Sequence, residues 1–105
     1  MAADGARVIH RFGEYELDAE RFELSRAGAL LDVQTRVLEV IEYLVRHRDR
    51  LVPRAELQAA VWAGVRVEED SLYRAIAIAR RLLETGAGVA EPIQTVRGKG
   101  YRWFN

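Results

Sequence analysis

Hydrophobic and polar residues alternate along the first part of the chain, from Val8 to about Asp32. Residues that can face a core recur there at every second position, separated by charged residues and by the short segments DAER and RAGA: Val8, His10, Phe12, Tyr15, Leu17, Phe22 and Leu24. A period of two with turn residues at short intervals is typical of an antiparallel sheet with one buried face. We therefore expect a strand meander that serves as scaffold.

The period changes at Gln34 to the three- and four-residue spacing of an amphipathic helix. Its apolar positions are Val37, Leu38, Ile41, Leu44 and Val45. This spacing predicts a helix of about 13 residues that ends at the segment HRDR. A shorter second helix is predicted in PRAELQAAVW, residues 53–62, because Pro53 suits a helix start and Gly64 a helix stop. Its inward residues are Leu57, Val61 and Trp62.

A third helix is predicted from the acidic segment EEDS, residues 68–71, to the region of Gly86. Each residue of a helix is rotated by about 100° from the one before it, so residues three or four positions apart lie on the same side. Four residues of this helix form one buried stripe in this way. These are Leu72, Ile76, Ala79 and Leu83. The opposite, solvent-facing side carries Tyr73, Arg74, Ala77, Ile78 and Arg81.

The end of the chain predicts a β-hairpin. Residues 93–96 and 101–104 can pair across RGKG, where Gly98 and Gly100 can take the positive φ that tight turns need. Three cations lie around these glycines: Arg97, Lys99 and Arg102. Four aromatic residues are expected in the core or at the root of the hairpin: Phe12, Trp62, Tyr101 and Trp103.

The formal net charge of the 105 residues is zero, but the charge is unevenly distributed. Residues 1–70 contain ten arginines and fourteen acidic residues, a net charge of −4. Residues 71–105 contain six cations and two acids, a net charge of +4. This asymmetry predicts that the second part faces a polyanion; an unevenly charged solvated surface is the alternative.

Composition narrows the class of protein. The length suits one domain, and the absence of cysteine excludes disulfides and thiolate metal sites and suits a cytoplasmic location. No apolar run approaches the roughly 18 residues of a membrane span. His10 and His47 lack a second ligand at metal spacing, and GKG lacks the context of a phosphate-binding loop. We find no nucleophile, base and orienting group at motif spacing, so we expect no metal, no cofactor and no enzymatic activity.

The predicted elements follow one another as a sheet, three helices and a hairpin. This is the order of a winged-helix domain preceded by a small sheet. The segments RFGEYELDAERFELSRAGALLDV, VIEYLVRHRDRLVPRAELQAAVW, VRVEEDSLYRAIAIARRLL and IQTVRGKGYRW together resemble the OmpR/PhoB-type winged-helix DNA-binding domain of bacterial transcriptional regulators. The most specific part is TVRGKGYR, which is the wing in that family. The resemblance implies an α+β winged helix-turn-helix domain over residues 8–105, preceded by a flexible tail over residues 1–7.

The resemblance also implies sequence-specific binding to double-stranded DNA and regulation of transcription. The third helix, about residues 69–84, would enter the major groove, and the wing, residues 93–104, would touch the backbone or minor groove. The DNA-binding positions carried over are Ser71, Tyr73, Arg74, Ala77, Ile78, Arg81, Arg97, Lys99 and Arg102, with Asp70 also facing the groove.

This chain departs from the family pattern on the groove-facing side. Ala77 and Ile78 stand where many members carry polar or basic residues. Hydrogen-bond readout must then depend mainly on Tyr73, Arg74 and Arg81, although apolar side chains can meet thymine methyl groups. Two further departures affect helix stability only: Gln34 and Pro53 stand where the family usually has a capping Thr or Ser.

Several of these positions have a structural alternative. Arg74 and Arg81 could pair along the helix with nearby acids, which are Glu68, Asp70 and Glu84. Arg80 lies at the edge of the buried stripe, so a phosphate contact or an internal ion pair suits it better than base readout. Tyr73 could simply cover the helix flank, and the wing cations could be ordinary residues of an exposed turn.

Two readings of the context stay open. Met1 lies only a few residues before the first strand, so the chain is expected to be either a stand-alone domain or the N-terminal domain of a regulator with a sensor domain downstream of Asn105. The resemblance implies RNA polymerase and a second copy on DNA as partners. The competing hypothesis is a protein-interaction module that has lost its DNA site, favoured by the zero net charge and the patch of Ala77 and Ile78.

Overall fold

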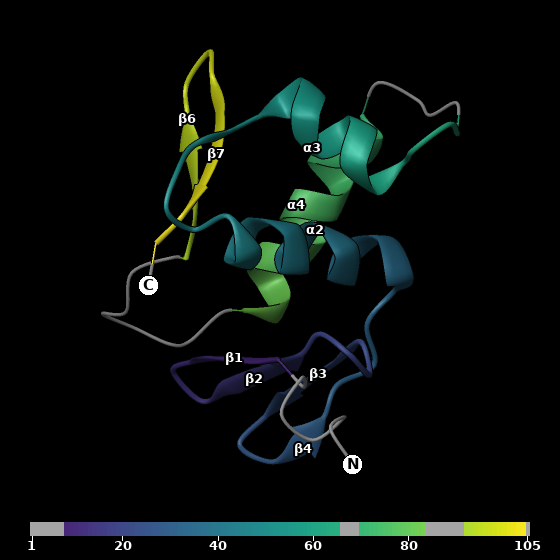
Figure 1. Cartoon of the computed structure of the whole chain (residues 1–105), viewed down its shortest axis with the longest axis vertical. Helices are drawn as coiled ribbons and strands as arrows, with labels where there is room; N and C mark the ends of the chain where they lie inside the picture. Colours follow the sequence, from purple (N-terminus) through teal and green to yellow (C-terminus); the bar gives the residue numbers. More distant parts are fainter. Residues whose placement is uncertain (1–7, 66–69, 84–91, 105) are drawn as a thin grey trace.

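The computed structural model describes residues 8–65, 70–83 and 92–104. The predicted tail, residues 1–7, lies outside these ranges. Within them lie seven strands and three helices (Figure 1): β1 Ile9–Phe12, β2 Tyr15–Asp18, β3 Glu23–Arg26, β4 Ala29–Leu30, α2 Thr35–Arg46, β5 Val52–Pro53, α3 Arg54–Val61, α4 Ser71–Leu82, β6 Ile93–Val96 and β7 Gly100–Trp103.

The N-terminal segment forms the predicted antiparallel meander, in the order β1-β2-β3-β4. Its inner face is buried and carries Phe12, Tyr15, Leu17 and Leu24, because Phe12 pairs with Tyr15 and alternate residues share a face. The expectation for Val8 is wrong: this residue precedes β1 and is 50% exposed.

Helix α2 lies in the middle of the molecule, with the meander on one side and α3 and the hairpin on the other (Figure 1). All five predicted inward residues are buried, and so is Val40, which the spacing did not select. The buried face is wider than one stripe because α2 contacts α3, α4 and β7. As expected, Gln34 and Pro53 provide no side-chain cap hydrogen bond to the described first turns of α2 and α3.

The hairpin belongs to a three-stranded sheet with the order β5-β7-β6. Strand β5 was not predicted, since two residues give no periodic pattern; its Val52 pairs with Tyr101 and its Pro53 with Gly100. Strand β7 begins one residue earlier than expected and ends at Trp103. Phe104 therefore lies outside the strand and is 46% exposed, a correction to the predicted range.

The meander is joined to the C-terminal half of the domain through aromatic residues. Tyr15 donates a hydrogen bond from its hydroxyl to the carbonyl oxygen of Leu82 at 2.8 Å, at the end of α4. Phe12 stacks on Tyr15 and meets Trp103 edge-on, with ring centroids 4.9 Å apart in the second pair. The predicted structural role of the four aromatics is confirmed, since Phe12, Trp62, Tyr101 and Trp103 are all buried. The sheet thus supports the end of α4 and the root of the hairpin.

Candidate nucleic-acid interface

The buried and exposed sides of α4 are those that the sequence predicts. The stripe of Leu72, Ile76, Ala79 and Leu83 is buried, together with Ala75. The outward residues are exposed: Tyr73, Arg74, Ala77, Ile78 and Arg81. Ser71, the first residue of the helix, is half-buried.

The ends of α4 differ from the prediction. The helix stops at Leu82 with Leu83 as C-cap, so it is shorter than expected. Gly86, residues 68–69 and residue 84 lie outside the described ranges. Asp70 occupies the N-cap position, but its side chain makes no cap hydrogen bond with the described first turn.

The carboxylate of Asp70 instead pairs with Arg74, one helical turn later. The distance from guanidinium nitrogen to carboxylate oxygen is 3.0 Å, which confirms the alternative of a pair along the helix for Arg74. Both side chains are more than half exposed, and surface pairs of this kind contribute only about 0.3–0.5 kcal/mol. The pair occupies Arg74 in the free protein and can be broken at little cost.

Tyr73 contacts a residue that the sequence analysis did not select. Arg54, the first residue of α3, donates a hydrogen bond to the Tyr73 hydroxyl, and its guanidinium carbon lies 5.1 Å from the centre of the Tyr73 ring. Arg54 and Tyr73 are both exposed, so this cation lies beside α4 on the molecular surface. Nothing in the sequence indicated it except its position in the first turn of the second helix.

Arg80 connects α4 to the hairpin. Its Nε donates to the carbonyl oxygen of Ile93 at 3.2 Å, and a terminal nitrogen donates to Thr95 Oγ1 at 2.7 Å. Arg80 thus turns inward as expected, but its contacts with β6 are hydrogen bonds rather than the predicted internal ion pair. These bonds hold the hairpin beside α4. Tyr101 of the hairpin is buried, and this burial raises the pKa of its hydroxyl.

The three predicted wing cations are all exposed. The tip is a tight turn in which the backbone N–H of Lys99 donates to the Val96 carbonyl at 2.9 Å and Gly98 has a φ of +75°. The side chains of Arg97 and Lys99 form no hydrogen bond or ion pair with the described residues. The Arg102 guanidinium lies 5.1 Å from the ring centre of Phe104.

Charge is unevenly distributed among the described elements. Residues 70–83 and 92–104 contain six cations and one acid, Asp70. The meander carries exposed acids at its turns and outer face, which are Glu14, Glu16, Glu20 and Glu23. A hollow of about 360 Å³ lies where α4 meets the start of α2, and its walls include Arg36, Ser71, Arg74 and Ile78. The surface of α4 and the hairpin is therefore cationic, with an apolar part at Ala77 and Ile78.

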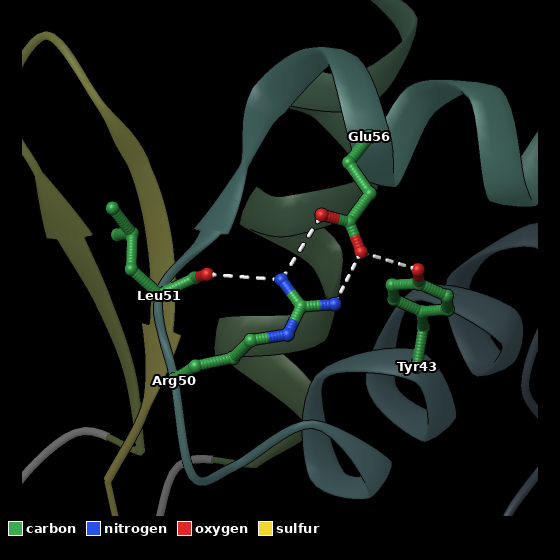
Figure 2. A network of polar contacts seen from close by, with 4 residues as sticks. All are labelled: Tyr43, Arg50, Leu51 and Glu56. Atoms are coloured by element: carbon green, nitrogen blue, oxygen red, sulfur yellow. Dashed lines mark hydrogen bonds and ion pairs between the residues drawn. The ribbon is translucent and has the colours of Figure 1, made fainter.

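A polar network fixes the start of α3, which carries Arg54. Figure 2 shows the Arg50 guanidinium facing the carboxylate of Glu56, with the Tyr43 hydroxyl on the other side of that carboxylate. One nitrogen of Arg50 donates to Glu56 at 3.0 Å and to the Leu51 carbonyl at 3.2 Å (Figure 2). Hydrogen bonds from Arg50 and Tyr43 lower the pKa of Glu56 to about 2. The hydrogen bond between Arg50 and Glu56 also raises the pKa of Arg50. No sequence pattern indicates this network, because its members come from α2, a loop and α3.

In the described part of the chain, no three His, Cys, Asp or Glu residues lie together in a way that could hold a metal ion. No helix in that part combines the length and the apolar character needed to cross a membrane.

Comparison with known proteins gives a match over most of the chain. Residues 28–103 match the family model described as "Transcriptional regulatory protein, C terminal". The chain is 30% identical over 92 residues to the sensory transduction protein RegX3 of Mycobacterium leprae, covering 86% of this chain and 46% of that protein. It is 29% identical to RegX3 of Mycobacterium tuberculosis H37Rv, covering 86% of this chain and 40% of the relative. The chain thus spans less than half the length of these curated relatives.

Solved structures share the fold. The DNA-binding domain of Escherichia coli CadC has a TM-score of 0.81 and 24% identity, covering 93% of this chain and 92% of that one. The DNA-binding domain of Klebsiella pneumoniae RstA, solved in complex with the RstA box, has a TM-score of 0.74 and 25% identity over 90% of this chain and 95% of that one. The predicted fold, a winged helix-turn-helix with an N-terminal sheet and a C-terminal hairpin, is confirmed.

Proposed function

Because the chain belongs to the transcriptional regulatory protein, C-terminal family, which comprises the OmpR/PhoB-type winged-helix DNA-binding domains, we propose that its residues 8–105 bind specific sequences in double-stranded DNA and regulate transcription. Helix α4 enters the major groove, and the wing formed by β6 and β7 lies against the backbone or the minor groove. The observation that carries the proposal is the set of exposed cations on α4 and on the wing, two elements that Arg80 joins by hydrogen bonds.

The cations divide by position. Arg97, Lys99 and Arg102 on the wing, with Arg54 at the start of α3, serve as phosphate contacts that set orientation. Arg81 and, after release from Asp70, Arg74 reach base edges from α4. The related RstA domain was solved in complex with the RstA box, which supports a binding role for a domain of this fold.

The family consists of DNA-binding domains of transcription regulators, so we assign this chain no catalytic role. It acts in the cytoplasm, where RNA polymerase and a second copy on DNA are its partners. The chain covers 40–46% of the curated relatives cited above, which supports a place within a longer protein with a regulatory domain.

The test is binding to random-sequence duplex DNA at low and moderate salt, followed by selection of preferred sequences. Each neutralised phosphate contributes about 0.9 to the slope of log affinity against log salt, so replacing Arg97 and Lys99 together with Ala should reduce the slope by up to about 2. The matched control replaces Arg11 and Arg26 of the meander with Ala. A folded wild-type domain that binds no duplex at low salt would refute the proposal and favour a protein-interaction module.

A further inference from the structure

The outward face of α4 has an apolar centre. Ala77 is exposed, and Ile78 leaves 37% of its surface in water. Arg74 lies four residues before Ile78 and Arg81 three residues after it, so both arginines are its neighbours on the helix surface. Contact with an apolar group of a ligand would remove the exposed area of Ile78 from water, which is favourable.

Three polar side chains of the same helix are already engaged within the protein. Arg74 pairs with Asp70, Arg80 turns inward to β6, and the hydroxyl of Tyr73 accepts a hydrogen bond from α3. Each of these contacts must be broken or shared before the side chain can bind a base edge. Ile78 needs no such rearrangement, because its exposed surface is available in the conformation of the free protein.

The major groove offers one apolar group, the C5 methyl of thymine, whereas the other bases present hydrogen-bonding atoms. We infer that Ile78, with Ala77 beside it, is a specificity-determining contact to thymine methyl groups in the middle of the sequence that α4 reads. This inference rests on the proposed DNA-binding function. It assigns sequence preference to the residues that depart from the family pattern.

Deoxyuridine provides the test, since it keeps every hydrogen-bonding atom of thymine and lacks only the methyl group. Duplexes selected by the wild-type domain are remade with deoxyuridine at one thymine position at a time. Losing a buried methyl contact should weaken wild-type binding by about three- to fivefold at the contacted positions and leave the others unchanged.

Variants identify the side chain responsible. Ile78→Ala should bind thymine and deoxyuridine duplexes equally, and Ile78→Val should retain an intermediate preference. The matched control is Leu30→Ala, which removes an exposed apolar side chain from β4 and should keep the wild-type preference. Comparing variant and base changes as a double-mutant cycle cancels any effect of deoxyuridine on the duplex itself. Urea unfolding confirms that each variant is folded.

Three results would overturn the inference, and they differ in whether the proposed DNA-binding function also fails. Sequence-selective binding by the wild type with no deoxyuridine effect leaves the proposed function intact. Equal deoxyuridine effects in the wild type and in Ile78→Ala assign the methyl contact to another residue. Failure of the folded wild type to bind any duplex at low salt removes the proposed function as well.

Discussion

Two arginines lie on the outward face of α4 but differ in their surroundings. Arg74 is held by Asp70 at 3.0 Å, while the side chain of Arg81 is exposed and forms no hydrogen bond or ion pair with the described residues. A guanidinium that holds no contact with the described residues can turn its planar fork to guanine O6 and N7 without first breaking one of them. Among single residues, Arg81 is therefore the main candidate for hydrogen-bond readout.

Replacing Arg81 with Ala should lower discrimination between a selected duplex and its scrambled form by about 1–3 kcal/mol, because one bidentate base contact is lost. Arg74→Ala should have a smaller effect, since Arg74 must first leave Asp70. Affinities for both duplexes at fixed salt measure this, with Arg11→Ala as control. Equal weakening on every sequence would instead make Arg81 a phosphate contact.

Glu56 predicts a pH dependence of stability. Its pKa falls from 4.5 to about 2 in the folded protein, because Arg50 and Tyr43 donate hydrogen bonds to the carboxylate. A lowered folded-state pKa contributes stability above the unfolded-state value, and that contribution is lost as the pH falls toward the folded-state value. Glu56→Gln should therefore be less stable than the wild type at pH 7, and the deficit should shrink below about pH 4.5.

Urea unfolding at several pH values between 7 and 3 measures that deficit. Tyr43→Phe removes one of the two hydrogen-bond donors, so its loss of stability at pH 7 should be smaller and should also shrink at low pH. A constant difference between wild type and Glu56→Gln over the whole range would contradict this account.

Among the elements, β5 decides how the wing is built. This two-residue strand pairs with the start of β7, and Gly100 lies directly against it. A Cβ atom on Gly100 would come within 2.8 Å of the Pro53 Cα and closer still to the Val52 oxygen. The two glycines of RGKG thus serve different purposes: Gly98 makes the turn, and Gly100 lets β5 approach.

Gly100→Ala should cost roughly 3 kcal/mol or more of unfolding free energy, because it combines a φ of +154° with a collision against backbone. Gly98→Ala, where φ is +75° and the space is open, should cost only about 1 kcal/mol. Chemical denaturation of the two variants compares them directly. Equal losses would show that the approach of β5 is not what requires a glycine at position 100.

For the whole molecule, the arrangement of charge matters more than its sum. The hairpin that carries the wing cations and the meander that carries exposed acids occupy opposite ends of the view in Figure 1, with α4 between them. A polyanion that approaches the cationic surface meets attractive charge at short range, while acids beyond about a Debye length are screened. A protein with zero net charge can therefore bind phosphate strongly.

The domain should be retained on a heparin column at low salt near its pI of about 6.7. Replacing Arg97 and Lys99 together with Ala should lower the elution salt clearly. Replacing Arg11 and Arg26 with Ala removes the same charge from the meander and should change the elution little. Equal shifts for the two double variants would show that net charge alone governs retention.

The sequence by itself determined the elements and their faces. Periods of two and of three to four predicted the meander, the three helices and the hairpin, and they predicted the exposed side of α4 and the wing cations, because such patterns depend only on local geometry. Their roles toward DNA stay predictions. The outward position of Val8 and the end of β7 before Phe104 were missed, since the termini of strands leave little pattern.

Only the tertiary structure decided how those elements are connected and which polar groups remain available. The addition of β5 to the hairpin, the contact of Arg54 with Tyr73, the bonds from Arg80 to β6 and the pairing of Arg50 with Glu56 all join residues from different elements. A sequence pattern repeats along one element, whereas a hydrogen bond between elements depends on how they pack in three dimensions. The composition of the exposed surface was therefore readable from the chain, and the availability of each side chain on it was not.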